Sequence, residues 1–422
     1  MGEYRYRVVD QELDELLTGL AAVAIEGPKA VGKTATAQRR ADVVFALDEP
    51  AQRELFAADP ARLDRASGLV LVDEWQRLPE VWDLVRRSVD RDQRAGHFLL
   101  TGSGAPRDTP SHSGAGRIVQ VRMRPMGLTE RGLDTPSVSL RELLTGQRPQ
   151  IDGKATLNLA DYTDEVVRSG FPGIRGLPPR ARRAQLDGYL TRVVKREFPE
   201  QGMVVRRPAT LRAWLAGYAA ATSSTASYNA ILEAATPGQA NKPAKTTAIG
   251  YRDVLDSLWL LDPVPGWLPS GNHFTRLVQA PKHHLADPAL AARLLGVDAE
   301  ALLSGRTPPV LRDGALLGRL FESLVTLTVR VLAQAAEASV HHLRTRNGDH
   351  EVDLIVQRPD RGVVAIEVKL APVVADADVV HLHWLGEKLG SGLLDAAVIT
   401  TGPHAYRRAD GIAVIPASLL GP

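Results

Sequence analysis

An eight-residue run near the amino terminus has the residue types that bind a nucleotide phosphate. It consists of Gly27, Pro28, Lys29, Ala30, Val31, Gly32, Lys33 and Thr34. Its spacing, G-x-x-x-x-G-K-[ST], is typical of a loop whose glycines let backbone N–H groups turn toward a phosphate. The lysine of such a loop reaches the β- and γ-phosphates, and the next hydroxyl ligates Mg²⁺. The run therefore predicts an ATP site with Lys33 on the phosphates and Thr34 on the metal.

The segments on either side of this loop support the prediction. A short apolar run, 21–25, precedes it, and a segment compatible with a helix, 34–40, follows it. This order of strand, loop and helix puts the positive end of a helix next to the bound phosphate. An ordinary turn rich in glycine and proline is the alternative, and the flanking strand and helix argue against it.

Two carboxylates follow a second apolar run, and they have the chemistry to complete the site. Residues 68–72 predict a fully buried parallel strand, which ends in Asp73 and Glu74. Ligands of open α/β sheets bind at the carboxyl edge of such strands. We therefore expect Asp73 to hold Mg²⁺ together with Thr34, and Glu74 to orient and deprotonate the attacking water.

Two further side chains are candidates for contacts with the nucleotide. The strand predicted at 97–103 ends in Ser103, which we expect to act as a polar sensor of the γ-phosphate or the water. Arg117 comes just before a fifth predicted strand, 118–123, and we expect it to reach nucleotide in its own or the next subunit. A role between subunits would require a dimer or a ring, and a plain surface arginine is an equal alternative.

Together these motifs resemble a bacterial and archaeal family of AAA-type ATPases. The resemblance rests on the loop at 27–34, on VDEWQRLP at 72–79, on LLTGS at 99–103 and on SGAGR at 113–117. It implies a five-stranded core with the phosphate-loop strand central, Glu74 as the catalytic residue and Ser103 as the sensor. Members of the wider family carry an uncharacterised C-terminal domain.

Length and composition bound the rest of the prediction. The chain has 422 residues, of which 44% are hydrophobic and 24% charged, with a net charge of +2 and no cysteine. These values are typical of a globular protein without disulfides or thiolate metal sites. No signal-peptide core or membrane-length apolar run is present, so we expect a cytoplasmic protein. We predict domains at 1–135, 150–280 and 281–422, with a linker rich in Thr, Pro and Gly at 132–155.

The middle region reads as helical. Three predicted helices, 211–222, 227–235 and 245–260, precede a ribbon at 261–268, which suggests a winged-helix-like module. Lys242, Lys245, Thr246 and Arg252 would lie on or beside its third helix. Such modules bind DNA or other proteins. The basic run at 175–207 is either a solvated helix face or a phosphate-binding surface.

A second set of acids lies in the C-terminal region. Asp353 begins one predicted strand, and Glu367 and Lys369 share a face of its neighbour because side chains alternate along a strand. Glu322 comes from a predicted amphipathic helix at 314–332. Two carboxylates and a lysine on one face suit divalent-metal chemistry on a phosphodiester. An ion-pair cluster on a surface hairpin is the alternative.

This second set resembles the PD-(D/E)xK nuclease superfamily. The resemblance implies Asp353 and Glu367 as metal ligands, Lys369 as the phosphate or water partner and Glu322 as the helical acid. The sequence thus predicts an α/β chain: a P-loop parallel-sheet domain, a winged-helix-like middle and a restriction-endonuclease-like domain. We expect Mg²⁺-dependent ATP hydrolysis coupled to nucleic-acid binding or cleavage. The alternative is a regulatory NTPase switch that binds a protein partner and carries a catalytically silent nuclease-like domain.

Overall fold

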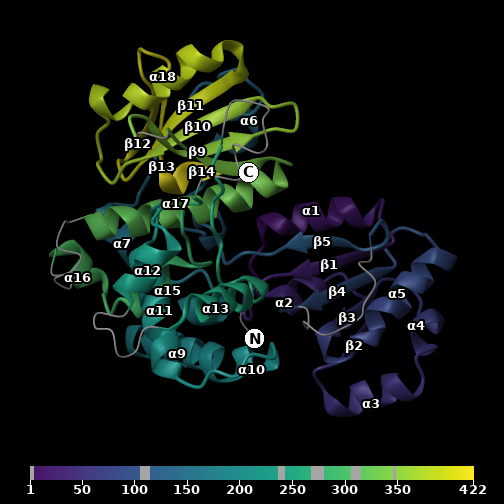
Figure 1. Cartoon of the computed structure of the whole chain (residues 1–422). Helices are drawn as coiled ribbons and strands as arrows, with labels where there is room; N and C mark the ends of the chain where they lie inside the picture. Colours follow the sequence, from purple (N-terminus) through teal and green to yellow (C-terminus); the bar gives the residue numbers. More distant parts are fainter. Residues whose placement is uncertain (1–3, 105–114, 236–242, 268–279, 306–314, 346–347) are drawn as a thin grey trace.

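The computed structural model describes residues 4–104, 115–235, 243–267, 280–305, 315–345 and 348–422. Two sheets form the two ends of the molecule, and the long helix α17 (Ala315–Ala335) lies between them (Figure 1). Helices from the middle of the chain lie beside the first sheet. No helix among the described residues combines the length and the apolar character that crossing a membrane requires.

The first sheet has five parallel strands in the order β2-β3-β4-β1-β5. They are β1 (Ala22–Glu26), β2 (Val43–Ala46), β3 (Val70–Asp73), β4 (Phe98–Gly102) and β5 (Val119–Arg122). Its helices are α1 (Val8–Leu17), α2 (Lys33–Gln38), α3 (Pro50–Ala58), α4 (Arg62–Arg65) and α5 (Glu80–Arg91). All five predicted strands are present. The phosphate-loop strand β1 is an interior strand, but β4 is the middle one, so β4 separates β1 from the acid-bearing β3.

The burial of this sheet explains its sequence. Alternate residues of the strands enter two different cores, because side chains alternate between the faces of a strand. Val23, Leu71 and Leu99 pack with Leu13 of α1 on one face. Ala24, Val72 and Leu100 pack with α3 and α5 on the other face. Strands covered on both sides are continuously apolar, which is why they could be predicted.

The middle of the chain is helical, as predicted. It contains α7 (Leu159–Arg168), α8 (Pro172–Arg175), α9 (Pro179–Arg192), a π-helix (Val193–Glu197), α10 (Phe198–Glu200), α11 (Pro208–Ala220), α12 (Tyr228–Ala234), α13 (Lys245–Ser257), α15 (Pro288–Leu294) and α16 (Ala299–Leu303). The ribbon after α13 pairs with a distant segment: Leu261 bridges Leu285, and Val264 bridges Lys282. Lys242 of the predicted basic face lies outside the described residues, and Arg252 pairs with its neighbour Asp253.

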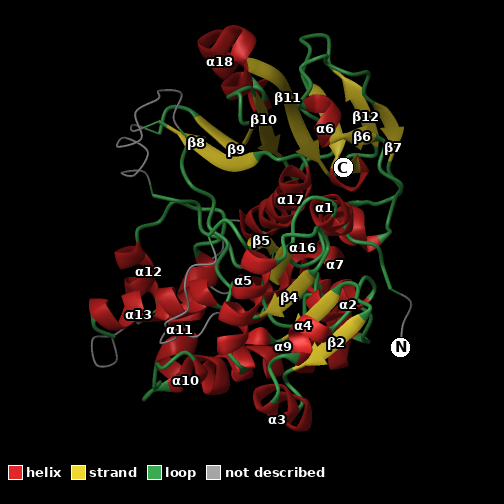
Figure 2. Ribbon diagram, turned by 90° about the vertical axis from the view of Figure 1, so that its right-hand side faces the viewer, coloured by secondary structure: helices red, strands yellow, loops and turns green. Residues whose placement is uncertain are grey.

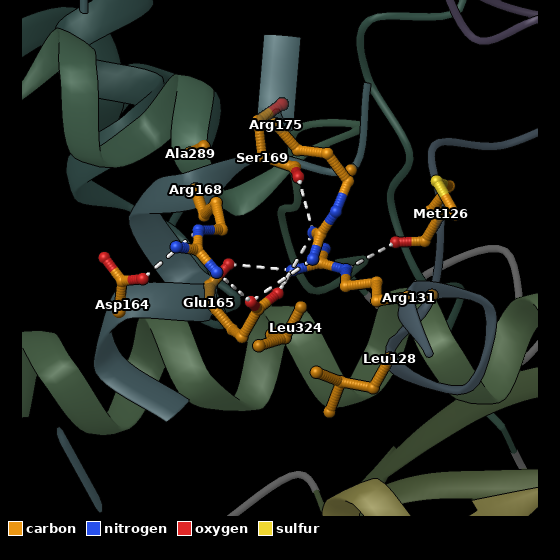
Figure 3. Close-up of polar contacts among 12 residues, drawn as sticks. Met126, Leu128, Arg131, Asp164, Glu165, Arg168, Ser169, Arg175, Ala289 and Leu324 are labelled. Atoms are coloured by element: carbon orange, nitrogen blue, oxygen red, sulfur yellow. Dashed lines mark hydrogen bonds and ion pairs between the residues drawn. The ribbon is translucent and has the colours of Figure 1, made fainter. Parts of the chain in front are cut away.

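A buried ion-pair cluster joins the first region to the helices (Figure 3). Arg131 ends a short 3-10 helix (Leu128–Arg131), and its Nη1 donates to the backbone oxygen and the carboxylate of Glu165 in α7, both at 2.8 Å. Arg175 also pairs with Glu165. Burial raises the pKa of Glu165, but Arg131 and Arg175 outweigh it and hold that pKa below its usual value. The pairing ties the segment that follows β5 to α7.

The second sheet is mixed and has the order β7-β12-β13-β11-β10-β9-β8. Its strands are β7 (Asp152–Lys154), β8 (Ser339–Arg344), β9 (Glu351–Gln357), β10 (Val363–Val368), β11 (Leu393–Thr400), β12 (His404–Arg407) and β13 (Ala413–Pro416). Figure 2 shows α18 (Val380–Leu389) above the second sheet and α17 below it. Leu354, Val364 and Ile366 face the core shared with α17, while Ile355 and Ala365 pack with α18.

The prediction of a linker at 132–155 is wrong. This segment contains β6 (Val138–Ser139), α6 (Leu140–Leu143) and β7, and all its strands pair with the end of the chain. β6 pairs with β14 (Leu420–Gly421), and β7 pairs with β12 in the second sheet. Strands of two or three residues are too short to show alternation, and their partners lie more than 200 residues away. Through these strand pairs, the segment connects the first region to the C-terminal sheet.

Candidate functional site

The phosphate loop leaves β1 through a glycine that no other residue can replace without strain. Gly27 has φ 152°, and a Cβ atom there would lie 2.1 Å from the carbonyl oxygen of Met123. Gly32 has φ 107° and caps α2, which begins at Lys33. Both glycines therefore meet a backbone requirement, which is the reason for their spacing in the motif.

The amide groups of this loop are available to a ligand. Within the part of the chain that the structure describes, we find no acceptor for the backbone N–H groups of residues 29–34. Such groups at a helix N-terminus form an anion site, because they carry partial positive charge and lack an intrahelical partner. The geometry fits a polyphosphate.

Lys33 is folded back onto the loop. Its Nζ donates to the carbonyl oxygens of Gly27 and Pro28, at 2.8 and 2.9 Å. Burial lowers the pKa of Lys33 to about 8, even though Glu74 and Asp73 act in the opposite direction. A phosphate in the loop would supply the negative charge that this buried ammonium lacks.

The predicted metal pair is in contact. Thr34 Oγ1 donates to Asp73 Oδ1 at 2.8 Å. Thr34 lies in α2, which follows β1, and Asp73 ends β3, so β4 lies between the two strands. The intervening strand contributes Thr101, whose hydroxyl also donates to Asp73 Oδ1. A hydroxyl and a carboxylate at this spacing fit Mg²⁺, which is usually held by few protein oxygens together with water and phosphate.

The two residues predicted for the hydrolytic step also meet. Ser103 Oγ donates to Glu74 Oε1 at 3.2 Å, and Gln76 Nε2 donates to Oε2 at 2.6 Å. Glu74 has φ 53°, in the left-handed region that such residues rarely adopt. Strain of this kind costs of order 1–3 kcal/mol and is concentrated at functional sites. The arrangement holds a carboxylate at the carboxyl edge of the sheet, beside the loop.

Arg117 does not reach this site within its own chain. It precedes β5, which runs parallel to β1 with Val119 opposite Val23, so it lies at the amino edge of the sheet. The loop leaves the carboxyl edge after Glu26, roughly 20 Å away at about 3.3 Å per residue. Arg117 instead pairs with Asp90 of α5 at 2.8 Å. Within its own chain Arg117 therefore does not reach the nucleotide, because a residue that precedes a parallel strand lies at the amino edge of the sheet. The expected contact with nucleotide in the next subunit stays a prediction.

The helical module covers one side of the loop. Lys29 Nζ lies 2.6 Å from the carboxylate of Glu197, which is buried in the π-helix, and 3.5 Å from that of Glu200. A cavity of about 250 Å³ lies between them, and its lining includes Lys29, Ser103 and Arg192. Two members of the basic run, Arg175 and Arg182, pair with acids of α7, as a structural role requires.

A larger cavity of about 600 Å³ lies on the other side of α2. Its lining includes the apolar side chains of Val31, Met123, Met126 and Pro172. Tyr4 also lines it, with the guanidinium of Arg39 4.2 Å from the centre of its ring. The cavity begins beside Gly32, and it offers an apolar surface of the kind that binds a planar base.

The C-terminal acids are brought together, but around a lysine that the sequence did not reveal. Lys282 Nζ lies 2.7 Å from Asp353, 3.0 Å from Glu322 and 3.1 Å from Glu351. Its side chain is only 1% exposed. Although burial lowers the pKa of Lys282, these three acids raise it well above its ordinary value.

Glu367 and Lys369 form the other half of this cluster. Lys369 Nζ donates to Glu367 Oε1 at 2.9 Å, and the backbone N–H of Val368 donates to Asp353 Oδ2. Glu367 Oε2 is buried without a hydrogen-bond partner among the described residues. Burial and the nearby Asp353 raise the pKa of Glu367. Within the described residues, no group of three or more His, Cys, Asp or Glu side chains is arranged to hold a metal ion.

Sequence reasoning missed four residues of the two sites. Thr101 contacts Asp73 from the neighbouring strand β4, which only the strand order shows. Gln76 contacts Glu74, which lies two residues before it. Glu351 lies two residues before Asp353, so alternation along the strand could have identified it. Lys282 carried no signal, because its ribbon is far in sequence from the acids.

Family comparisons match three parts of the chain. Residues 21–131 match the AAA domain family. Residues 159–301 match a domain of unknown function, DUF8612, and residues 317–420 match another, DUF4143. The first match supports an AAA-type P-loop domain that binds ATP, whereas the third gives no support to a nuclease.

Two curated relatives extend over nearly the whole chain. Uncharacterized proteins of Mycobacterium tuberculosis (Rv2008c) and Mycobacterium bovis (Mb2031c) are each 26% identical over 408 residues, covering 94% of this chain and 80% of the relative. This chain is thus similar over nearly its whole length to these two proteins.

Two solved structures share a low overall likeness. The Walker-type ATPase PABY2304 of Pyrococcus abyssi has a TM-score of 0.37 at 15% identity, over 68% of this chain and 94% of that one. The ORC2 protein of Aeropyrum pernix has a TM-score of 0.29 at 16% identity, over 76% of this chain and 96% of that one. The family match and the loop geometry together identify residues 21–131 as an AAA-type P-loop domain.

Proposed function

We propose that this protein is a Mg²⁺-dependent ATPase that works as a regulatory switch. It acts by binding a protein partner, and its C-terminal domain does not cleave nucleic acid. The observation that carries the proposal is the pair of hydrogen bonds at the carboxyl edge of the first sheet, Thr34 to Asp73 and Ser103 to Glu74. They bring the four predicted side chains together beside a loop with open amide groups.

Each side chain has a distinct task in the proposed hydrolysis. The loop amides and Lys33 bind the phosphates, while Thr34 and Asp73 would hold the metal, which neutralises charge on the β- and γ-phosphates. Glu74 accepts a proton from water as it attacks in line. Ser103 keeps the Glu74 carboxylate oriented. Thr101, on β4 between β1 and β3, orients Asp73.

The base is proposed to lie in the 600 Å³ cavity beside α2. Ala35 is exposed on α2 and lines this cavity. Ala35→Phe should weaken ATP binding at least tenfold and leave the binding of inorganic tripolyphosphate unchanged, because only ATP has a base to displace. Equal weakening of both ligands, measured by calorimetry, would place the base elsewhere.

The central proposal is tested by nucleotide binding and turnover. Calorimetry with a non-hydrolysable ATP analogue and Mg²⁺ should give one site per chain, lost in Lys33→Ala. Steady-state assays should show phosphate release by the intact protein and none by Lys33→Ala. Retained turnover at the wild-type rate in that variant would contradict the site.

The binding-only output is favoured by the contacts of the C-terminal acids. All three acids around Lys282 are engaged with an ammonium, and Glu367 is engaged with Lys369. Coupling to nucleic-acid cleavage is the competing prediction. Incubation with plasmid and Mg²⁺ or Mn²⁺, beside Asp353→Ala, separates them: metal-dependent nicking that the variant loses would establish cleavage and refute the binding-only output.

A further inference from the structure

The carboxylates of the C-terminal cluster surround a cation that belongs to the protein itself. Lys282 Nζ is within 3.1 Å of one oxygen from each of Asp353, Glu322 and Glu351. An ammonium has three N–H donors and no acceptor, so three carboxylate partners satisfy it fully. The three acids come from β9 and α17, and the lysine comes from the ribbon that pairs 261–264 with 282–285.

Both oxygens of Asp353 already accept a hydrogen bond. Its Oδ1 accepts from Lys282, and its Oδ2 accepts from the backbone N–H of Val368 at 2.9 Å. In the arrangement that the sequence predicted, Asp353 and Glu367 share a metal, and here the ammonium of Lys282 lies against Asp353 instead. Glu367 Oε2 has no hydrogen-bond partner among the described residues, and one carboxylate oxygen is a weaker ligand set than the two carboxylates that the sequence predicted.

The position of Lys282 is fixed by the backbone. Val264 and Lys282 exchange two backbone hydrogen bonds of 2.9 Å. Two residues earlier on the same ribbon, Asp262 is buried between Arg124 at 2.8 Å and Arg330 at 2.9 Å. Arg124 follows β5 of the first sheet, and Arg330 belongs to α17. The lysine is thus attached to a segment that is anchored to both neighbouring regions.

We propose that Lys282 is a permanent internal substitute for the divalent cation of this acid cluster. The cluster then joins the ribbon, α17 and β9 as a structural clamp, and the domain does not cleave phosphodiesters by metal catalysis. The inference does not depend on ATP hydrolysis in the first domain, because the two acid clusters share no residue.

The proposal predicts that removal of the lysine creates a metal site. Lys282→Met leaves Asp353, Glu322 and Glu351 without their shared partner, so the full-length variant should bind one Mn²⁺ per chain with at least tenfold higher affinity than the intact protein. The free ion is counted by its electron paramagnetic resonance signal, in the absence of nucleotide. Lys282→Met combined with Asp353→Asn should lose the new site.

Matched controls keep the test decisive. Lys369→Met removes the other lysine of the cluster but leaves Lys282 in place, so it should bind no Mn²⁺. A folded Lys282→Met protein that binds no Mn²⁺ would overturn the proposal. If Lys282→Met does not fold, Mn²⁺ binding is compared between the intact protein and Asp353→Asn. Mn²⁺ that the intact protein binds and Asp353→Asn does not bind would refute the proposal. If neither protein binds Mn²⁺, the proposal is supported.

Discussion

The chain contains two clusters of carboxylates, and they differ in what neutralises them. At the edge of the first sheet, Asp73 and Glu74 accept hydrogen bonds from hydroxyl and amide groups, which bring no charge. In the second domain, Asp353 and Glu367 contact ammonium groups. A cluster with neutral partners still needs a cation, whereas a cluster with lysines has one. The residue that pairs with an acid, and not the acid itself, decides whether the cluster suits a metal.

The strongest test of the first cluster is removal of its proposed base. Glu74→Gln keeps the shape of the side chain and its contact with Ser103, but it cannot accept a proton. General-base catalysis contributes about 10²- to 10⁴-fold, so kcat should fall by at least about 100-fold. The affinity for ATP should remain within about threefold, measured by calorimetry. An unchanged kcat would assign the base to another residue.

The second cluster should respond to lysine removal through stability. Lys282→Met leaves buried acids unpaired, and breaking a buried ion pair costs about 3–5 kcal/mol. The free energy of unfolding is measured in urea. Lys369→Met is the matched control: Lys369 is 32% exposed and pairs with one buried acid, Glu367, so its loss of stability should be smaller than that of Lys282→Met, which leaves three acids unpaired. Equal losses in the two variants would contradict the distinction between these lysines.

The lysine of the phosphate loop should make ATP binding depend on pH. Burial lowers the pKa of Lys33 to about 8 in the free protein, and bound phosphate raises it. Below about pH 7 the lysine is charged in both states, so affinity is flat. Above about pH 8 binding must take up a proton, so affinity should fall, by up to about tenfold per pH unit. Lys33→Arg, charged throughout, should not show this fall in calorimetry.

The smallest expected effect concerns the contact between the loop and the helical module. Lys29 is partly exposed, and its partner Glu197 is buried at 2.6 Å. A double-mutant cycle with Lys29→Met and Glu197→Gln should give a coupling of about 1 kcal/mol in the free energy of unfolding. A coupling near zero would show that the module does not hold the loop through this pair.

The parts that could be predicted from sequence are those whose signals are local. The strands that lead to Gly27 and Asp73 are covered on both faces, so they are continuously apolar and could be predicted. The spacing of the phosphate loop identified Lys33 and Thr34. Strand order is not local, which is why the contact of Thr101 with Asp73 was overlooked. The short strands at 138–139 and 152–154 have partners near the end of the chain. Lys282 reaches Asp353 across 71 residues, and no pattern in its own segment indicates that contact.

One measurement tests the contrast between the two clusters most directly: the number of Mn²⁺ ions bound per chain with and without a non-hydrolysable ATP analogue. We expect one ion with the analogue, held at Thr34 and Asp73, and none without it, because Lys282 supplies the cation of the second cluster. An ion bound without nucleotide and lost in Asp353→Asn, or no ion bound with it, would contradict this.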